Sequence, residues 1–393
     1  MNADQTWHFP RMNHPPTASR LLAAALLGLL LGHAIQAIAE EPARPEGTEV
    51  VIPGTQTRAI HSNIVGQDYQ LQISLPRGYA ESDQRYGVIY LLDAQWDFPL
   101  LYAIYGEQYY DGFVPGLIIV GILWGGENPD PNVLRLRDFT PTDEGDNGES
   151  GGADKFLAFL DKELIPYVDR EFRTSGNRTL AGSSLGGLFT LYALFNRPDL
   201  FDNFIPTSPA TPWDGGSVFI SIAGFAERSA ANPGRLFVAA SELEQLRPPF
   251  EDLVSMLKER GYPGLTWTSH LVSGAGHSGV KAEGYSRGLQ FAYQRPDLAL
   301  SAGDRQRLLG SYRSADGSGT AVVFQREGRI WGRAPETGQE REFHARDRLD
   351  FYHPGEFMNV RFLANETGEV TGFVVETFDG KQTFRKIDDT GPD

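Results

Sequence analysis

Gly182, Ser184 and Gly186 have the spacing G-x-S-x-G within a largely apolar stretch of the chain. The residues before them are short and apolar, as in a buried strand, and leucines follow them at helical spacing. A strand, a sharp turn and a helix together hold a serine in a strained conformation with its hydroxyl exposed at a helix N-terminus. The spacing therefore predicts that Ser184 is a nucleophile.

The same spacing occurs a second time, at Gly148, Ser150 and Gly152. These residues belong to an acidic, glycine-rich run over residues 143–152, and no strand precedes them. Such a run is typical of a solvated loop. We therefore interpret Ser150 as a loop residue and keep Ser184 as the candidate.

A serine hydroxyl needs a base to remove its proton, and the base works best when a carboxylate orients it. In the chain order Ser, acid, His, the base follows in a loop late in the domain. Six of the eight histidines lie outside that region: His8, His14, His33, His61, His344 and His353. Of the other two, His270 lies inside the strand-like segment 265–272, and His277 lies in the flexible loop 273–279. We predict His277 as the base.

The acid is expected directly after a strand that follows the serine. Residues 236–240 read as that strand, and Glu242 and Glu244 follow it. On position alone either carboxylate could reach the histidine.

Two backbone N–H groups are needed to stabilise an oxyanion. Leu185, directly after the nucleophile, is expected to supply one. The other is expected from the loop 93–96, with Gln95 as the first candidate and Trp96 as the second.

Apolar runs at residues 88–92, 117–122, 204–206 and 236–240 read as strands buried on both faces. Amphipathic helices are expected between them, for example at residues 153–172. This alternation predicts an α/β fold, with a mostly parallel central sheet flanked by helices. We place the catalytic domain at residues 57–298.

Short alternating segments separated by turns follow, and they predict a small antiparallel β-barrel or sandwich at residues 304–387. At the other end, residues 21–31 are apolar but too short to span a bilayer comfortably, and Ala37-Ile38-Ala39 suits a signal peptidase. We therefore predict a signal peptide over residues 1–39, a flexible lead-in over 40–56, and a periplasmic or secreted mature protein.

The 393 residues carry a formal net charge of −16 and no cysteine. Such a charge repels nucleic acids and anionic lipid, so neither is expected as a partner. Disulfides and thiolate metal sites are excluded, and no other ligand cluster is visible, so neither metal nor cofactor is expected. The expected partner is a small-molecule ester, and the sequence carries no signal for the oligomeric state.

Several separated motifs resemble those of the putative-esterase family of α/β-hydrolases. They are residues 90–93, 137–141, 151–168, the Ser184 turn, 241–244, 276–280 and 285–289. The siderophore-esterase branch, with esterase D-like members nearby, is the most similar. The resemblance implies a Ser-His-Glu triad with Glu244 as its acid and Glu242 as the alternative. Ala94 departs from the family, which often has glycine there. Residues 304–387 resemble, more weakly, a lipocalin-like domain.

The substrate is expected to be a siderophore ester or another aryl or acyl ester. Arg135 and Arg137 are candidates for binding an anionic or catecholate group, and pairing with Asp138 is the structural alternative. Trp96 is a candidate aromatic contact. Two other functions stay open: an acyltransferase with the same triad and a sugar or alcohol acceptor, and a non-catalytic binding module on the same fold.

Overall fold

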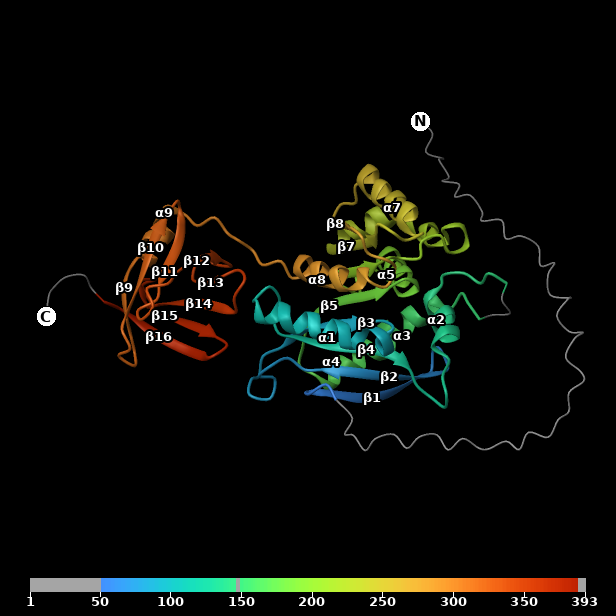
Figure 1. The fold of residues 1–393 in the computed structure, drawn as a ribbon, viewed down its shortest axis with the longest axis horizontal. Helices are drawn as coiled ribbons and strands as arrows, with labels where there is room; N and C mark the ends of the chain where they lie inside the picture. Colours follow the sequence, from blue (N-terminus) through green and yellow to red (C-terminus); the bar gives the residue numbers. More distant parts are fainter. Residues whose placement is uncertain (1–50, 146–148, 388–393) are drawn as a thin grey trace, which may run out of the picture. The chain divides into compact units, whose positions relative to one another are not determined.

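The computed structural model describes residues 51–145 and 149–387 (Figure 1). The predicted signal peptide and most of the lead-in lie outside the described residues. Within the described part of the chain, no helix is both long and apolar enough to cross a membrane.

The catalytic part is built on one eight-stranded sheet, ordered β1-β2-β4-β3-β5-β6-β7-β8. β1 and β2 are antiparallel to their neighbours, and the strands from β4 to β8 are parallel. Its strands are β1 (Thr55–Ser62), β2 (Gln67–Ser74), β3 (Tyr86–Leu91), β4 (Leu117–Trp124), β5 (Thr174–Ser183), β6 (Asn203–Thr207), β7 (Gly234–Ser241) and β8 (Leu265–Val272). The predicted α/β fold is confirmed.

Helices cover both faces of this sheet (Figure 1). They are α1 (Ala94–Tyr110), α2 (Pro131–Phe139), α3 (Ala153–Phe159), α4 (Ile165–Glu171), α5 (Leu185–Asn196), α6 (Phe225–Ala231), α7 (Arg247–Arg260) and α8 (Val280–Ala292). A π-helical turn, Leu160–Leu164, joins α3 to α4, and short 3-10 turns lie at Trp213–Gly215 and Ser217–Ile222. The helix predicted over 153–172 is therefore continuous as far as Glu171 and contains one π-helical turn.

Alternate residues of each buried strand point to opposite faces of the central sheet. Leu236 and Val238 of β7 point into the core that contains α5. Phe237 is on the opposite face, where a Cβ at Gly288 of α8 would lie 3.3 Å from its ring and closer still to Ile205 Cγ2 of β6, with which it would clash. The close approach of α8 to the sheet therefore requires glycine at that position.

The C-terminal part is a closed antiparallel barrel ordered β10-β11-β12-β13-β14-β15-β16-β9, preceded by α9 (Ala302–Leu308). Its strands are β9 (Gly310–Ser314), β10 (Thr320–Arg326), β11 (Arg329–Arg333), β12 (Glu340–Ala345), β13 (Asp350–Tyr352), β14 (Met358–Ala364), β15 (Val370–Thr377) and β16 (Gly380–Ile387). Buried aromatic rings fill its core, among them those of Tyr312, Phe362 and Phe373. Of the two architectures expected from the sequence, the barrel is the one observed.

Candidate active site

Ser184 lies between β5 and α5 with a backbone φ of 59° and ψ of −117°. This is a conformation that side chains other than glycine rarely adopt. The turn is tight enough that a Cβ at Gly182 would lie 2.7 Å from the carbonyl of Gly186. Glycine at position 182 is therefore required by the close approach of strand and helix, whereas a Cβ at Gly186 would lie 3.2 Å from Asp93 Oδ2.

Backbone hydrogen bonds hold this turn in place. The Ser184 N–H donates to the Thr207 carbonyl across 3.0 Å, and the Ser184 carbonyl accepts from Ala210 N–H at 3.1 Å. Among the described residues, no group hydrogen-bonds the half-buried Ser184 hydroxyl. The end of β6 thus fixes the serine backbone, and the side chain stays available for chemistry.

His277 and Glu244 meet at the ends of β8 and β7. Glu244 Oε2 lies 2.6 Å from His277 Nδ1, and the glutamate side chain is 3% exposed against 43% for the histidine. A buried carboxylate on Nδ1 fixes the tautomer that leaves Nε2 as the proton acceptor. No hydrogen bond joins His277 to Ser184 in the described structure; such contacts are often long before substrate binds.

The second carboxylate oxygen of Glu244 is also occupied. Its Oε1 accepts from the Ser241 N–H and from the Ser208 hydroxyl, each at 2.6 Å. Both oxygens of Glu244 thus have donors, which fixes the plane of the carboxylate beside the imidazole. Ser208 could not be predicted as a partner of Glu244, because it is 36 residues away in the chain.

Glu242, the alternative acid, binds a different group. Its Oε2 accepts from the Ser273 hydroxyl at 2.7 Å and from the Gly274 N–H at 3.0 Å. These two hydrogen bonds, the Ser273 bond first, lower the pKa of Glu242 below its ordinary value. Glu242 therefore ties down the loop that carries His277 and does not touch the imidazole.

His270, the other histidine of this region, contacts a surface carboxylate. Its Nε2 lies 2.9 Å from Glu283 Oε1, and both side chains are more than a third exposed. Ser150, of the second G-x-S-x-G match, is buried in its loop and accepts from the Glu144 N–H at 3.2 Å.

The N-termini of α1 and α5 supply the candidate oxyanion donors. Leu185 and Gln95 occupy the first turns of these helices, and within the described structure their N–H groups have no backbone partner. The Trp96 N–H donates to the Asp93 carbonyl at 3.0 Å. This difference favours Gln95 over Trp96 as the second donor.

Ala94 is accommodated because the positive φ falls one residue earlier, at Asp93, where it is 54°. Ala94 is then an ordinary helical residue, fully buried. A Cβ at Gly121 of β4 would lie 2.8 Å from the Ala94 methyl group, so Gly121 provides the space that Ala94 fills.

Arg135 of α2 holds the Asp93 turn. Its Nε and Nη2 donate to the two carboxylate oxygens of Asp93 at 3.0 and 2.7 Å. The same guanidinium lies 5.7 Å from the ring centroid of the exposed Trp96. Burial raises the pKa of Asp93, and the paired Arg135 opposes that rise. The carboxylate partner of Arg135 is thus Asp93, not Asp138.

Arg137 pairs with Asp138, through Nε at 2.7 Å and Nη2 at 3.1 Å. The buried Asp138 also accepts from the Tyr69 hydroxyl and the Trp124 indole N–H, each at 2.7 Å. Binding of substrate by Arg135 and Arg137 stays a prediction; the structure shows both guanidinium groups paired with carboxylates.

The side chain of Gln95 has an unusual environment. Both its amide nitrogen and its amide oxygen are buried without a hydrogen-bond partner. Buried amides normally find partners, and the exceptions require an explanation. The side-chain amide of Gln95 is such an exception, directly beside the candidate oxyanion N–H of the same residue.

The catalytic part is similar to known esterases. A family model described as "Putative esterase" matches residues 62–245. The ferri-bacillibactin esterase BesA of Bacillus subtilis is 32% identical over 274 residues, which cover 64% of this chain and 94% of BesA. The chain belongs to this esterase family. It is an ester hydrolase of the α/β-hydrolase superfamily.

Solved structures agree with this esterase assignment. The BES protein from Bacillus cereus superposes with a TM-score of 0.58 at 27% identity, covering 63% of this chain and 97% of that one. An IroE-like serine hydrolase from Shewanella oneidensis gives 0.54 at 25% identity, covering 65% and 84% of the two chains. The family model ends before β8, so His277 of this esterase lies outside the matched residues.

Proposed function

We propose that this esterase hydrolyses siderophore esters through an acyl-enzyme formed on Ser184, with His277 as base and Glu244 as the acid that orients it. The hydrogen bond between Glu244 and His277 carries the proposal, because it joins two of the three groups in the geometry the reaction needs. The strained backbone of Ser184 supports its role as the nucleophile, the third group of the triad.

The reaction proceeds in two steps. His277 Nε2 takes the Ser184 proton as the hydroxyl oxygen attacks the ester carbonyl, and the protonated imidazole then donates to the leaving alkoxide. A water molecule, activated by the same nitrogen, releases the acid and restores Ser184. In both tetrahedral intermediates the Leu185 and Gln95 N–H groups stabilise the oxyanion, and the positive ends of α5 and α1 add to that stabilisation.

The substrate class is supported by the relatives and by the surface near the site. Curated relatives include siderophore esterases, such as the siderophore enterobactin esterase of Emericella nidulans, 30% identical over 42% of this chain and 62% of its own length. Trp96 and Leu243, on two of the segments that build the site, are 48% and 70% exposed. An exposed indole beside a guanidinium suits an aromatic acyl group.

The test compares wild type with Ser184→Ala on a panel of esters. The panel contains bacillibactin and enterobactin, each with and without ferric iron, together with p-nitrophenyl acetate and a feruloyl ester. We expect Ser184→Ala to lower hydrolysis of every substrate by more than about a thousandfold. Residual activity within tenfold of wild type would remove Ser184 from the mechanism; a preference for the feruloyl or acetyl ester would retain the triad and overturn the substrate.

Two further measurements address the alternatives. Product analysis with competing sugar and alcohol acceptors separates hydrolysis from acyl transfer, and we expect the free acid. Labelling of Ser184 by a fluorophosphonate probe tests the binding-module alternative, which predicts no labelling.

We also propose that the protein is exported after cleavage before Glu40, on the strength of the apolar run 21–31 and the Ala37-Ile38-Ala39 pattern. Intact-mass measurement of protein from the cell envelope and the medium tests this: a mature chain that begins before Leu21 would contradict it.

A further inference from the structure

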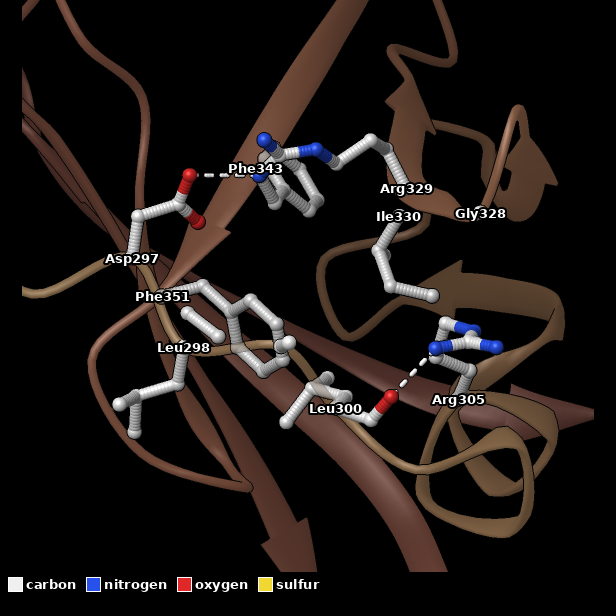
Figure 2. A pocket seen from close by; sticks show the side chains of 11 residues that line it. Asp297, Leu298, Leu300, Arg305, Gly328, Arg329, Ile330, Phe343 and Phe351 are labelled. Carbon is white, nitrogen blue, oxygen red and sulfur yellow. Dashed lines mark hydrogen bonds and ion pairs between the residues drawn. The ribbon is translucent and has the colours of Figure 1, made fainter.

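A pocket with a volume of about 230 Å³ lies at one end of the barrel (Figure 2). The chain segment 297–300 passes over it and is tied to β12 by the Leu298 N–H, which donates to the Ala345 carbonyl at 2.9 Å. Its lining residues are Asp297, Leu298, Ala299, Leu300, Arg305, Gly328, Arg329, Ile330, Phe343, Ala345 and Phe351. None of them belongs to the catalytic constellation.

The pocket is closed off from the rest of the barrel by packed side chains. Ile330, Phe343 and Phe351 form its inner wall and are each less than 9% exposed. Beyond them the rings of Tyr312, Phe362 and Phe373 contact one another in the core. A ligand therefore fits between the segment 297–300 and this apolar wall, and does not enter the core.

The two arginines of the pocket differ in their partners. Arg329 is neutralised by Asp297, 2.6 Å away, and lies 3.5 Å from Glu342. Arg305, from α9, has no carboxylate within ion-pair distance in the part of the chain that the structure describes. Its Nη1 donates to the Leu300 carbonyl, and its Nε is buried without a hydrogen-bond partner.

Arg305 lines the pocket without a carboxylate partner among the described residues, and a bound anion would supply one through charge-assisted hydrogen bonds. Only one cation of the pocket lacks a counter-charge, so the ligand should carry one negative charge. A second negative group would meet the Asp297 carboxylate on the other side of the pocket (Figure 2).

We propose that this pocket binds an aromatic monocarboxylate, with its carboxylate on Arg305 and its ring against Leu298 and Leu300, above the apolar wall. The volume suits such a ligand, because an apolar cavity of about 150 Å³ already holds benzene. The proposal does not rest on the esterase activity, since it uses none of the residues of that site.

The test is calorimetric titration of the full chain with benzoate as the probe. We expect one saturable site below about 10 mM benzoate that is weakened at least tenfold in Arg305→Gln. Arg307→Gln is the matched control on the same helix, because Arg307 pairs with Asp304 and lies outside the pocket. The benzoate affinity of this variant should equal that of wild type. Benzyl alcohol, which has the ring without the charge, should bind at least tenfold more weakly than benzoate.

A second variant tests the position of the ring independently. Leu298 lines the pocket and is 48% exposed, so Leu298→Trp fills the space without disturbing the core. It should abolish benzoate binding while the melting temperature stays within a few degrees of wild type. Equal benzoate affinity in wild type and Arg305→Gln, equal affinity for benzyl alcohol, or no saturable binding by wild type would each overturn the proposal.

Discussion

Ser208 donates its hydroxyl to Glu244 Oε1 across 2.6 Å, on the opposite side of the carboxylate from His277. Ser208 is fully buried, and its backbone has a φ of 45°. A non-glycine residue in this region is unusual, and here the conformation places the hydroxyl at the end of β6 directly against the acid. The carboxylate of Glu244 thereby joins the ends of β6, β7 and β8.

Removal of this hydroxyl should slow the chemical step. In Ser208→Ala the Glu244 carboxylate loses one hydrogen-bond donor, so the imidazolium becomes less well oriented. We expect the activation free energy to rise by about 1.4 kcal/mol, which corresponds to a tenfold lower kcat. KM should stay unchanged, because Ser208 does not contact substrate. Steady-state kinetics check this, and an unaltered kcat would show that the hydroxyl serves packing alone.

The two glutamates of the β7 loop should differ sharply on substitution. Glu244→Ala leaves the imidazole without its carboxylate and should lower kcat/KM by about a thousandfold. Glu242→Ala loosens only the loop anchored at Ser273 and Gly274 and should cost less than about tenfold. Kinetic constants of the two variants, with circular dichroism as the folding control, test this order; the reverse order would assign the acid to Glu242.

The Asp93–Arg135 ion pair predicts that removing Arg135 lowers the free energy of unfolding, and that neutralising Asp93 as well restores part of the loss. Both side chains are largely buried, with 3% and 16% exposed. Arg135→Met leaves Asp93 as an uncompensated charge and should destabilise the fold by about 3 kcal/mol. Adding Asp93→Asn should recover more than half of that loss, as measured by urea unfolding. Additive losses in the double variant would show that the two side chains act separately.

Gln95 predicts opposite effects on stability and on turnover. Its amide has no partner in the described structure, so Gln95→Leu removes an unsatisfied polar group and should raise the free energy of unfolding by up to about 1 kcal/mol. If the amide binds substrate, kcat/KM should fall at least tenfold. Thermal melts and kinetics on one preparation measure both; unchanged kinetics would limit Gln95 to its backbone N–H.

Glu242 predicts how the His277 loop responds to acid. Because hydrogen bonds lower its pKa below the ordinary 4.5, its contribution to stability is fully present above that value and is lost as the pH falls through the lower folded pKa. The protection factor of the Gly274 amide, which is its intrinsic exchange rate divided by its observed rate, should therefore stay constant down to pH 5 and fall only below pH 4.5. Glu242→Gln should remove this dependence, and a protection factor that falls already at pH 6 would contradict the assignment.

The sequence predicted the parts of the site that depend on local pattern. Ser184 was found from its glycines and the strand and helix around them, and His277 from its loop after a strand. Helix α1 was missed, because Pro99 lies inside it and its aromatic residues do not gather on one face. Only turn residues and apolar runs can be recognised from a local pattern. The first turn of α1 contains neither, so the helix could not be predicted.

Contacts between distant segments were not predictable in the same way. Asp93 and Arg135 lie 42 residues apart, and the sequence predicted only that Arg135 or Arg137 binds substrate or pairs with Asp138; Arg137 forms that pair. Only the fold brings the β3 end and α2 together. The role of Glu242 was likewise hidden, since its partners Ser273 and Gly274 belong to the next strand's loop.

The order of the central sheet has a consequence for handling the protein. The barrel is closed, so the free sheet edges within residues 51–145 and 149–387 are β1 and β8. An edge strand is a template for pairing with another chain. β8 ends at Val272, and the loop that carries His277 follows it directly. A foreign strand paired along β8 would therefore lie on the same edge strand that leads into the loop of the proposed base.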